Sequence, residues 1–107
     1  MALLRLGRLP ESALAAAAEF HAKVLPLLDP PRDGEDLLII FPPADYTHRA
    51  WRLAAVQGLA RELAPIRVNA VASDDEAAIA AALHYLANAP GVTGQYWPLD
   101  VEGAGSA

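Results

Sequence analysis

The sequence predicts an α/β layered fold with a short, mainly parallel sheet of about three to four strands and helices packed on it. Two apolar runs, LLIIF at 37–41 and IRVNAVA at 66–72, are continuous and short, which is typical of strands buried on both faces. Segments with helical periodicity alternate with these runs, so parallel pairing through right-handed crossovers is expected. The 107 residues are expected to form one domain over 1–103, followed by a flexible tail at 104–107.

The first helix is expected in LPESALAAAAEFHAKVLPLL, residues 9–28, where Pro10 and Glu11 mark its entry. Pro26 is expected to end or kink the last turn, because proline has no N–H for the helical hydrogen bond. Upstream of this helix, MALLRL at 1–6 could add a leading strand. The apolar positions of the helix that recur near the helical period are Leu14, Ala17, Ala18, Val24 and Leu25.

A second helix is predicted from about Asp45, a suitable N-cap, to Ala64, since Pro65 then stops it. Its middle, LAAVQGLA at 53–60, has Gln57 as its only polar side chain. A helix exposed along one side would carry a broader polar stripe. The second helix is therefore expected to be covered on more than one side.

The third helix follows the second apolar run at once. Ser73 and Glu76 have the spacing of a capping box, and the acidic residues between them suit the positive end of the helix dipole. VTGQYWPLDV at 92–101 is the candidate for the last strand. The apolar stripe of this helix is expected at Ile79, Ala82, Leu83 and Leu86.

Composition narrows the classes of function. Hydrophobic residues make up 54% of the chain, more than a small monomer easily buries, so part of the surface is expected to meet a partner. The net charge is -5 and the basic residues are scattered, which disfavours nucleic-acid binding. The chain has no cysteine, no signal-peptide pattern and no apolar run long enough to span a membrane. A cytoplasmic protein that binds neither membrane nor nucleic acid is expected.

Metal binding is not expected. His21, His48 and His84 stand in three separate predicted elements, without a partner at ligand spacing on one helix face. The acidic run at 74–76 is explained by its place at the start of a helix.

The second half of the chain resembles a known enzyme family. LARELAPIRVNAVA at 59–72, followed by EAAIAAALHYLANAPGVTGQYWPLDVEG at 76–103, is similar to the C-terminal half of short-chain dehydrogenases/reductases (SDR). The resemblance implies the rear part of a Rossmann domain, hence a truncated Rossmann-like fold. It also implies that Asn69 has a hydrogen-bonding role in the fold, as the family's asparagine does on that strand.

The catalytic motif of the family is altered here. Without a gap, the resemblance places the family's tyrosine on Asp45 and its lysine on Arg49, whereas a shift of one residue recovers Tyr46 but places Ala50 at the lysine. The family's serine position falls within 41–43, which offers no hydroxyl. An ordinary carboxylate is a poor proton donor at neutral pH, so Asp45, Tyr46 and Arg49 are interpreted as the remnant of a catalytic site.

Cofactor binding is also expected to be lost. The family's glycine-rich phosphate loop lies upstream of everything matched here, and Gly7 and Gly34 are isolated. No cofactor is therefore expected, and NAD(P) would be bound only under the alternative interpretation given below.

The resemblance implies association. In the family, the catalytic helix and the helix before it pair with their copies in another subunit, and the last helix and strand form a second interface. The leading interpretation is a catalytically inactive SDR-like scaffold, either a homo-oligomer or the partner of a full-length dehydrogenase. The candidate interface residues are Trp51, Ala55, Gly58, Leu59, Tyr96 and Trp97.

The alternative interpretation is a divergent NAD(P)-dependent oxidoreductase or a small-ligand binder that uses a cleft near Tyr46. In that interpretation Tyr46, His48 and Arg49 form a polar pocket with Arg52 and bind an anion.

Overall fold

The computed structural model describes residues 1–28 and 34–99, so the expected domain boundary at 103 and the tail at 104–107 lie outside the described residues. The strands are β1 (Ala2–Arg5), β2 (Leu37–Phe41), β3 (Val68–Ala72) and β4 (Tyr96–Pro98). The α-helices are α1 (Ala13–Glu19), α2 (Leu25–Leu28), α3 (Arg49–Glu62) and α4 (Glu76–Ala87). A π-helical segment, Phe20–Val24, joins α1 to α2, and a 3₁₀ turn, Tyr46–His48, leads into α3.

The sheet confirms the predicted α/β class. All four strands are parallel and follow the order β1-β2-β3-β4, with Leu37 opposite Val68 and Phe41 opposite Ala72 in the central pair. Every residue of β2 and of β3 is buried, as their continuous apolar runs predicted. The strand suggested in MALLRL and the one expected within VTGQYWPLDV are both present as the edge strands of the sheet.

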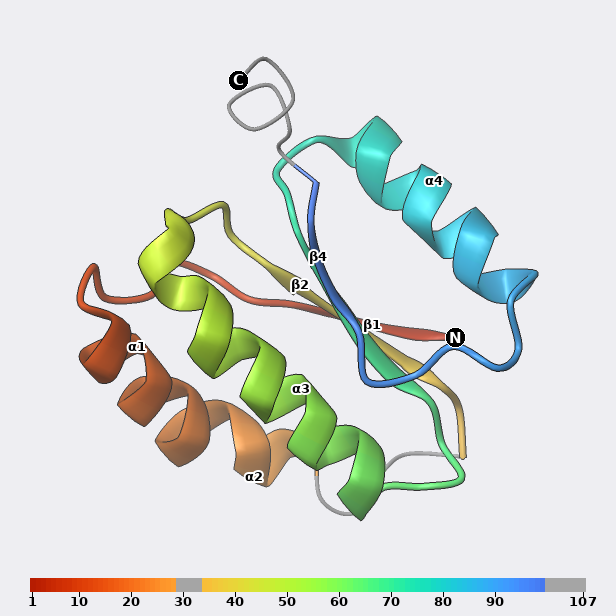
Figure 1. Ribbon diagram of the computed structural model, residues 1–107, viewed down its shortest axis with the longest axis horizontal. Helices are drawn as coiled ribbons and strands as arrows, with labels where there is room; N and C mark the ends of the chain where they lie inside the picture. The colour runs from red at the N-terminus through yellow and green to blue at the C-terminus, as the bar shows by residue number, and fades with distance from the viewer. Residues whose placement is uncertain (29–33, 100–107) are drawn as a thin grey trace.

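Two hydrophobic cores lie on opposite faces of the sheet (Figure 1). Alternate residues of β2 divide between them, because successive side chains of a strand point to opposite faces. Leu37, Ile39 and Phe41 pack toward α1, α2 and α3, whereas Leu38 and Ile40 pack toward α4. The chain is thus a three-layer arrangement with a thick helical layer on one face and a single helix on the other.

The expectation of right-handed crossovers is wrong for the last connection. Each of the three connections moves along the sheet in the same direction, from β1 toward β4. The first two place their helices on one face, but α4 crosses on the opposite face, so β3-α4-β4 has the opposite hand (Figure 1). The first two are right-handed, as nearly all such connections are, and the third is left-handed.

The first helix differs from its prediction in phase and in regularity. Leu14, expected in the core, is 85% exposed, and Ala16, Phe20 and Leu28 are buried instead. These positions are separated by multiples of four residues, and the wider turns of the π-helical segment keep them on one face. Pro26 does not end the helix, which continues to Leu28. The helix is irregular directly before this proline, where the Leu25 N–H donates to the Phe20 carbonyl.

The N-cap residue predicted from the sequence is correct for the turn before α3 and wrong for α4. Asp45 caps the 3₁₀ turn before α3, where its carboxylate accepts from the Thr47 N–H at 2.9 Å, as expected. At α4 the predicted capping box is wrong, because the N-cap is Asp75, which accepts from the Ala77 N–H at 3.0 Å. The Ser73 hydroxyl oxygen accepts from the Asp75 N–H instead, since the chain makes an extra turn before the helix begins. The expected burial of Ile79 and Leu86 is confirmed.

Candidate functional site

A cavity of about 1080 Å³ opens at the edge of the sheet where β1 and β2 end. The carboxyl ends of parallel strands meet at one edge, which is where ligands of open α/β folds bind. The loop at 6–11 after β1 and the loop at 42–45 after β2 form its walls. His48, Arg52 and Asp74 complete the lining.

Arg52, on the first turn of α3, is the unusual residue of this cavity. It is 1% exposed, and its guanidinium lies 4.6 Å from the centre of the Phe41 ring. Its Nη1 donates to the Pro42 carbonyl at 2.9 Å and to the Tyr96 hydroxyl at 3.2 Å. No carboxylate of the described residues forms an ion pair with it, and its buried Nε has no hydrogen-bond partner. Buried charges are ordinarily paired, so the unpaired Arg52 makes this cavity the candidate ligand site.

His48 is buried beside Arg52 and has a structural role. Its Nε2 lies 2.9 Å from the Glu11 carbonyl, and its Nδ1 accepts from Trp51 Nε1 at 3.0 Å. Since Nδ1 is an acceptor, Nε2 carries the proton and donates a hydrogen bond to the backbone carbonyl of Glu11. The ring therefore ties the loop after β1 to the start of α3 and fixes one wall of the cavity.

Asp45, Tyr46 and Arg49, the residues interpreted from the sequence as a catalytic remnant, do not line one common pocket. The Asp45 carboxylate accepts hydrogen bonds from the hydroxyl and the N–H of Thr47, and these bonds hold its pKa below the ordinary value. Tyr46 is 86% exposed, and Arg49 is also exposed. Asp45 lines the cavity, but Tyr46 and Arg49 do not. Of the polar pocket expected from the sequence, the structure thus brings together only His48 and Arg52.

The chemistry available at this edge is limited. No residue that lines the described cavity carries a hydroxyl or an ammonium group. Ser73, at the end of β3, is buried, and its oxygen already accepts from the Asp75 N–H at 2.9 Å. The lining offers carboxylates, the buried guanidinium of Arg52, the exposed guanidinium of Arg8 and apolar walls, which together can bind a ligand but include no phenol for proton transfer.

The candidate interface residues fall into two groups. Ala55, Leu59 and Tyr96 are buried in the core beneath the helices, and Trp51 is partly buried with its ring centre 5.6 Å from that of Phe20. Gly58 is partly exposed on α3, whereas Trp97 is partly buried under α4, 6.0 Å from the Tyr85 ring. An interface role for these residues stays a prediction.

A second hollow, of about 470 Å³, lies between α2 and α3 on the helical face. Gly58 borders it, and a Cβ built on Gly58 would meet nothing within 4 Å. Ala55 and Leu59, buried from the side of the sheet, form part of the lining of the same hollow. We call this feature the α2–α3 groove.

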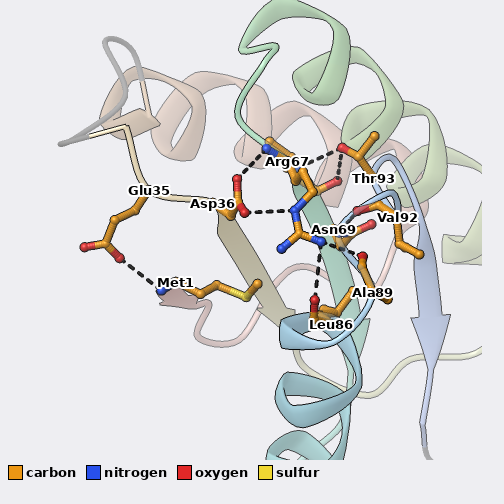
Figure 2. Close-up of polar contacts among 10 residues, drawn as sticks. Met1, Glu35, Asp36, Arg67, Asn69, Leu86, Ala89, Val92 and Thr93 are labelled. Carbon is orange, nitrogen blue, oxygen red and sulfur yellow. Dashed lines mark hydrogen bonds and ion pairs between the residues drawn. The ribbon is translucent and has the colours of Figure 1, made fainter.

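The opposite, amino-terminal edge of the sheet is closed by polar contacts (Figure 2). Arg67 Nε donates to Asp36 Oδ2 at 2.8 Å, and its backbone N–H donates to Oδ1 at 2.8 Å. Its Nη1 also donates to the carbonyl of Leu86, in the last turn of α4, at 3.3 Å and to that of Ala89, just beyond the helix, at 2.7 Å. The Arg67 backbone N–H, together with the guanidinium, keeps the pKa of Asp36 below its ordinary value.

Asn69 confirms the expected hydrogen-bonding role. Its Nδ2 donates to the Val92 carbonyl at 3.0 Å, and its Oδ1 accepts from the Gln95 N–H at 3.0 Å. Thr93 adds a bond from the Val68 N–H to its hydroxyl oxygen at 3.0 Å. The sequence did not predict the role of Arg67, because its contacts with the carbonyls at the end of α4 join residues that are far apart in the chain.

Metal and membrane sites can be judged for residues 1–28 and 34–99. That part of the chain contains no group of three or more side chains placed to hold a metal ion. Asp75 is the N-cap of α4. Glu76 forms a bidentate ion pair with Arg5, in which Arg5 Nη1 and Nη2 donate to the two carboxylate oxygens at 2.8 and 2.7 Å, and these hydrogen bonds lower the pKa of Glu76. None of the helices described has the length and apolar character that crossing a membrane requires.

Comparison with known proteins agrees with the architecture. A family model described as SDR-like, short chain dehydrogenase-like protein, matches residues 4–99. No curated protein and no solved structure shows significant similarity to the chain. The matched segment includes β2, β3, β4 and all the described helices, together with the last two residues of β1. The chain therefore belongs to the SDR-like family of short-chain dehydrogenase-like proteins.

Proposed function

We propose that this protein is a non-catalytic member of its family that associates with another subunit through the helical face formed by α1, α2 and α3. The partner is either a second copy or a full-length dehydrogenase. The observation that carries the proposal is the α2–α3 groove, which is open and lined largely by apolar residues. Exposed apolar hollows of this kind mark sites of protein association.

The groove has a shape suited to a helix. Ala54 and Gly58 give its α3 side a low profile, because neither side chain extends beyond Cβ. On the α2 side, Leu25 and Pro26 form the rim, and the neighbouring Leu27 is 67% exposed. Small residues allow the backbones of two helices to approach closely, and flanking leucines then bury apolar surface.

The arrangement at the carboxyl-terminal edge supports the non-catalytic part of the proposal. Asp45 stands where the family's tyrosine is expected, and its two hydrogen bonds from Thr47 favour the ionised form, which cannot donate a proton. Tyr46, the nearest phenol in sequence, is 86% exposed and outside the cavity lining. A proton donor for a ketone substrate is therefore not expected to act from this segment.

The test is the mass of the full chain in solution, measured by light scattering over a range of concentrations. We expect a dimer or larger assembly, or a stable complex when a dehydrogenase from the same source is added. A chain that is monomeric at every concentration and forms no such complex would contradict the proposal.

A matched pair of variants locates the contact. Gly58→Glu places a charged side chain in the groove and is expected to reduce the assembly to monomer. Because glutamate has a higher helix propensity than glycine, the helix itself is not expected to weaken. Gln57→Glu adds the same charge at the neighbouring exposed position outside the groove lining, and its mass is expected to stay that of the wild type. Equal masses for the Gly58→Glu variant and the wild type would place the contact elsewhere.

The alternative function, a divergent NAD(P)-dependent oxidoreductase, is tested by fluorescence titration of NADH and NADPH. Dinucleotide phosphates are usually held by free N–H groups at a helix N-terminus. Here Ser12, Asp45 and Asp75 cap the starts of α1, of the turn before α3 and of α4. We expect no saturable binding, and binding at micromolar concentrations would favour the alternative.

A further inference from the structure

The counter-charge of Arg52 is missing from the described chain. Arg52 cannot lose its proton under ordinary conditions, so the buried side chain always carries its positive charge. A buried charge without a partner is strongly unfavourable, and stacking on Phe41 at 4.6 Å compensates for only part of the lost hydration. The position is therefore suited to an anion that enters from the cavity that Arg52 lines.

The free side of the guanidinium indicates the shape of this anion. Nη1 is occupied by the Pro42 carbonyl and the Tyr96 hydroxyl. Nε has no partner, and no described residue accepts from Nη2. Nε and Nη2 together form a side of the guanidinium that can donate two parallel hydrogen bonds to one carboxylate.

The surroundings disfavour phosphate. The cavity is lined by the carboxylates of Glu11, Asp45 and Asp74 and by the guanidinium groups of Arg8 and Arg52. Because the acidic groups outnumber the basic ones, this lining would repel a group with two negative charges more than a group with one. The turn before α3 also offers no free site, since Asp45 already accepts from the Thr47 N–H. A singly charged carboxylate meets less repulsion and needs no helix N-terminus.

The walls indicate the rest of the ligand. Leu6, Leu9 and Pro10 come from the loop after β1, and Pro42 and Pro43 come from the loop after β2. These side chains offer apolar contact, and the cavity volume of about 1080 Å³ is ample for a small organic molecule. The ligand therefore combines one carboxylate with an apolar body.

We propose that the cavity between the loops after β1 and β2 binds a small monocarboxylic acid, with its carboxylate paired to Arg52 and its apolar body against the leucine and proline walls. This inference does not depend on the proposed association through the helical face. Binding requires a local shift at Arg52, because its Nε is shielded from solvent in the unliganded arrangement.

The experiment titrates benzoate, benzamide and inorganic phosphate into the full chain by calorimetry. We expect benzoate to bind, and benzamide, which has the same shape without the charge, to bind roughly 10- to 100-fold more weakly. Phosphate is expected to bind more weakly than benzoate. Benzamide binding as tightly as benzoate, or phosphate binding more tightly, would overturn the proposal.

Two arginine variants identify the residue. Arg52→Met is expected to weaken benzoate binding by roughly 10- to 100-fold. Arg49→Met removes an exposed arginine of the same helix that does not line the cavity, and is expected to keep wild-type affinity. Undiminished benzoate binding by Arg52→Met would overturn the proposal. A second pair of results would also overturn the proposal: the wild type does not bind benzoate, and Arg52→Met has a lower oligomer mass than the wild type. In that case the counter-charge of Arg52 would come from another subunit.

A measurement on the wild type covers the case in which Arg52→Met does not fold. The Nε–H signal of Arg52 in the NMR spectrum is expected to move downfield as benzoate is added, because the proton gains a charged acceptor. An unchanged signal at saturating benzoate would contradict the proposed pairing.

Discussion

Two arginines, at opposite edges of one sheet, differ in how their charges are satisfied. Arg67, at the amino-terminal edge, donates to a carboxylate and to two backbone carbonyls (Figure 2). Arg52, at the carboxyl-terminal edge, is more deeply buried, yet it has only neutral acceptors and an Nε without a partner. The amino-terminal edge thus has an arginine whose charge is paired, whereas the carboxyl-terminal edge has an arginine with a hydrogen-bond donor left without an acceptor.

The largest expected effect comes from breaking the satisfied edge. Arg67→Ala leaves Asp36 without its cation and removes the donor to the Leu86 and Ala89 carbonyls. We expect the free energy of unfolding, measured by urea denaturation, to fall by about 2–3 kcal/mol. Arg61→Ala, at an exposed site on α3, is the control and should change it by less than about 0.5 kcal/mol. Equal effects of the two variants would contradict the role given to Arg67.

A somewhat smaller loss is expected at the neighbouring amide. Asn69→Ala leaves the Val92 carbonyl and the Gln95 N–H without partners and opens a small void beside β3. The expected loss in the free energy of unfolding is about 2 kcal/mol. Asn88→Ala provides the comparison, because Asn88 bonds only the His84 carbonyl from an exposed position. A loss no greater than that of Asn88→Ala would show that the Asn69 bonds contribute little.

The carboxyl-terminal edge should be much less sensitive to loss of its arginine. Arg52→Met replaces an unpaired buried charge by an apolar side chain of similar length. We expect the free energy of unfolding without ligand to change by less than about 1 kcal/mol, because removing the unpaired buried charge offsets the hydrogen bonds that the Pro42 carbonyl and the Tyr96 hydroxyl lose. Thermal denaturation followed by circular dichroism measures this change. A clear loss of stability would mean that the neutral acceptors already satisfy Arg52, and the contrast between the edges would disappear.

The smallest effect concerns pH at the satisfied edge. Because the folded state holds the pKa of Asp36 below its ordinary value of 3.8, the ionised group stabilises the fold above that value. This contribution is lost as the pH falls through the lower, folded pKa. The stability difference between wild type and Asp36→Asn, from urea denaturation, should therefore be largest near neutral pH and shrink below about pH 4. A difference that is constant with pH would show that Asp36 is not linked in this way.

The sequence predicted the central parts of the fold because their signals are local. The apolar runs of β2 and β3 and the cap at Asp45 each depend on a few neighbouring residues. The burial of Ala16 in place of Leu14 was not predicted, because it depends on where the helix meets the sheet. The N-cap of α4 was predicted at Ser73, two residues before the observed cap at Asp75. The Ser73 hydroxyl does accept a backbone hydrogen bond, but from the Asp75 N–H before the helix begins.

The site was less predictable than the fold. Arg49 and Arg52 lie on the same helix and look alike in sequence, yet the first is exposed and the second is buried against Phe41 and Tyr96. Those contacts join α3, β2 and β4, which are far apart in the chain, so the spacing of residues in the sequence cannot predict them. The sequence hypothesis of an anion pocket included Arg52, and the structure separates it from Tyr46 and Arg49.

The reversed hand of the β3-α4-β4 connection determines which faces of the sheet are covered by helices. Had every loop turned the same way, all the helices would have stacked on one side, and Leu38, Ile40 and Val71 would have faced water. By switching sides once, the chain shields both surfaces of its sheet with few helices. One change of side thus lets a single sheet bury apolar residues on both of its faces.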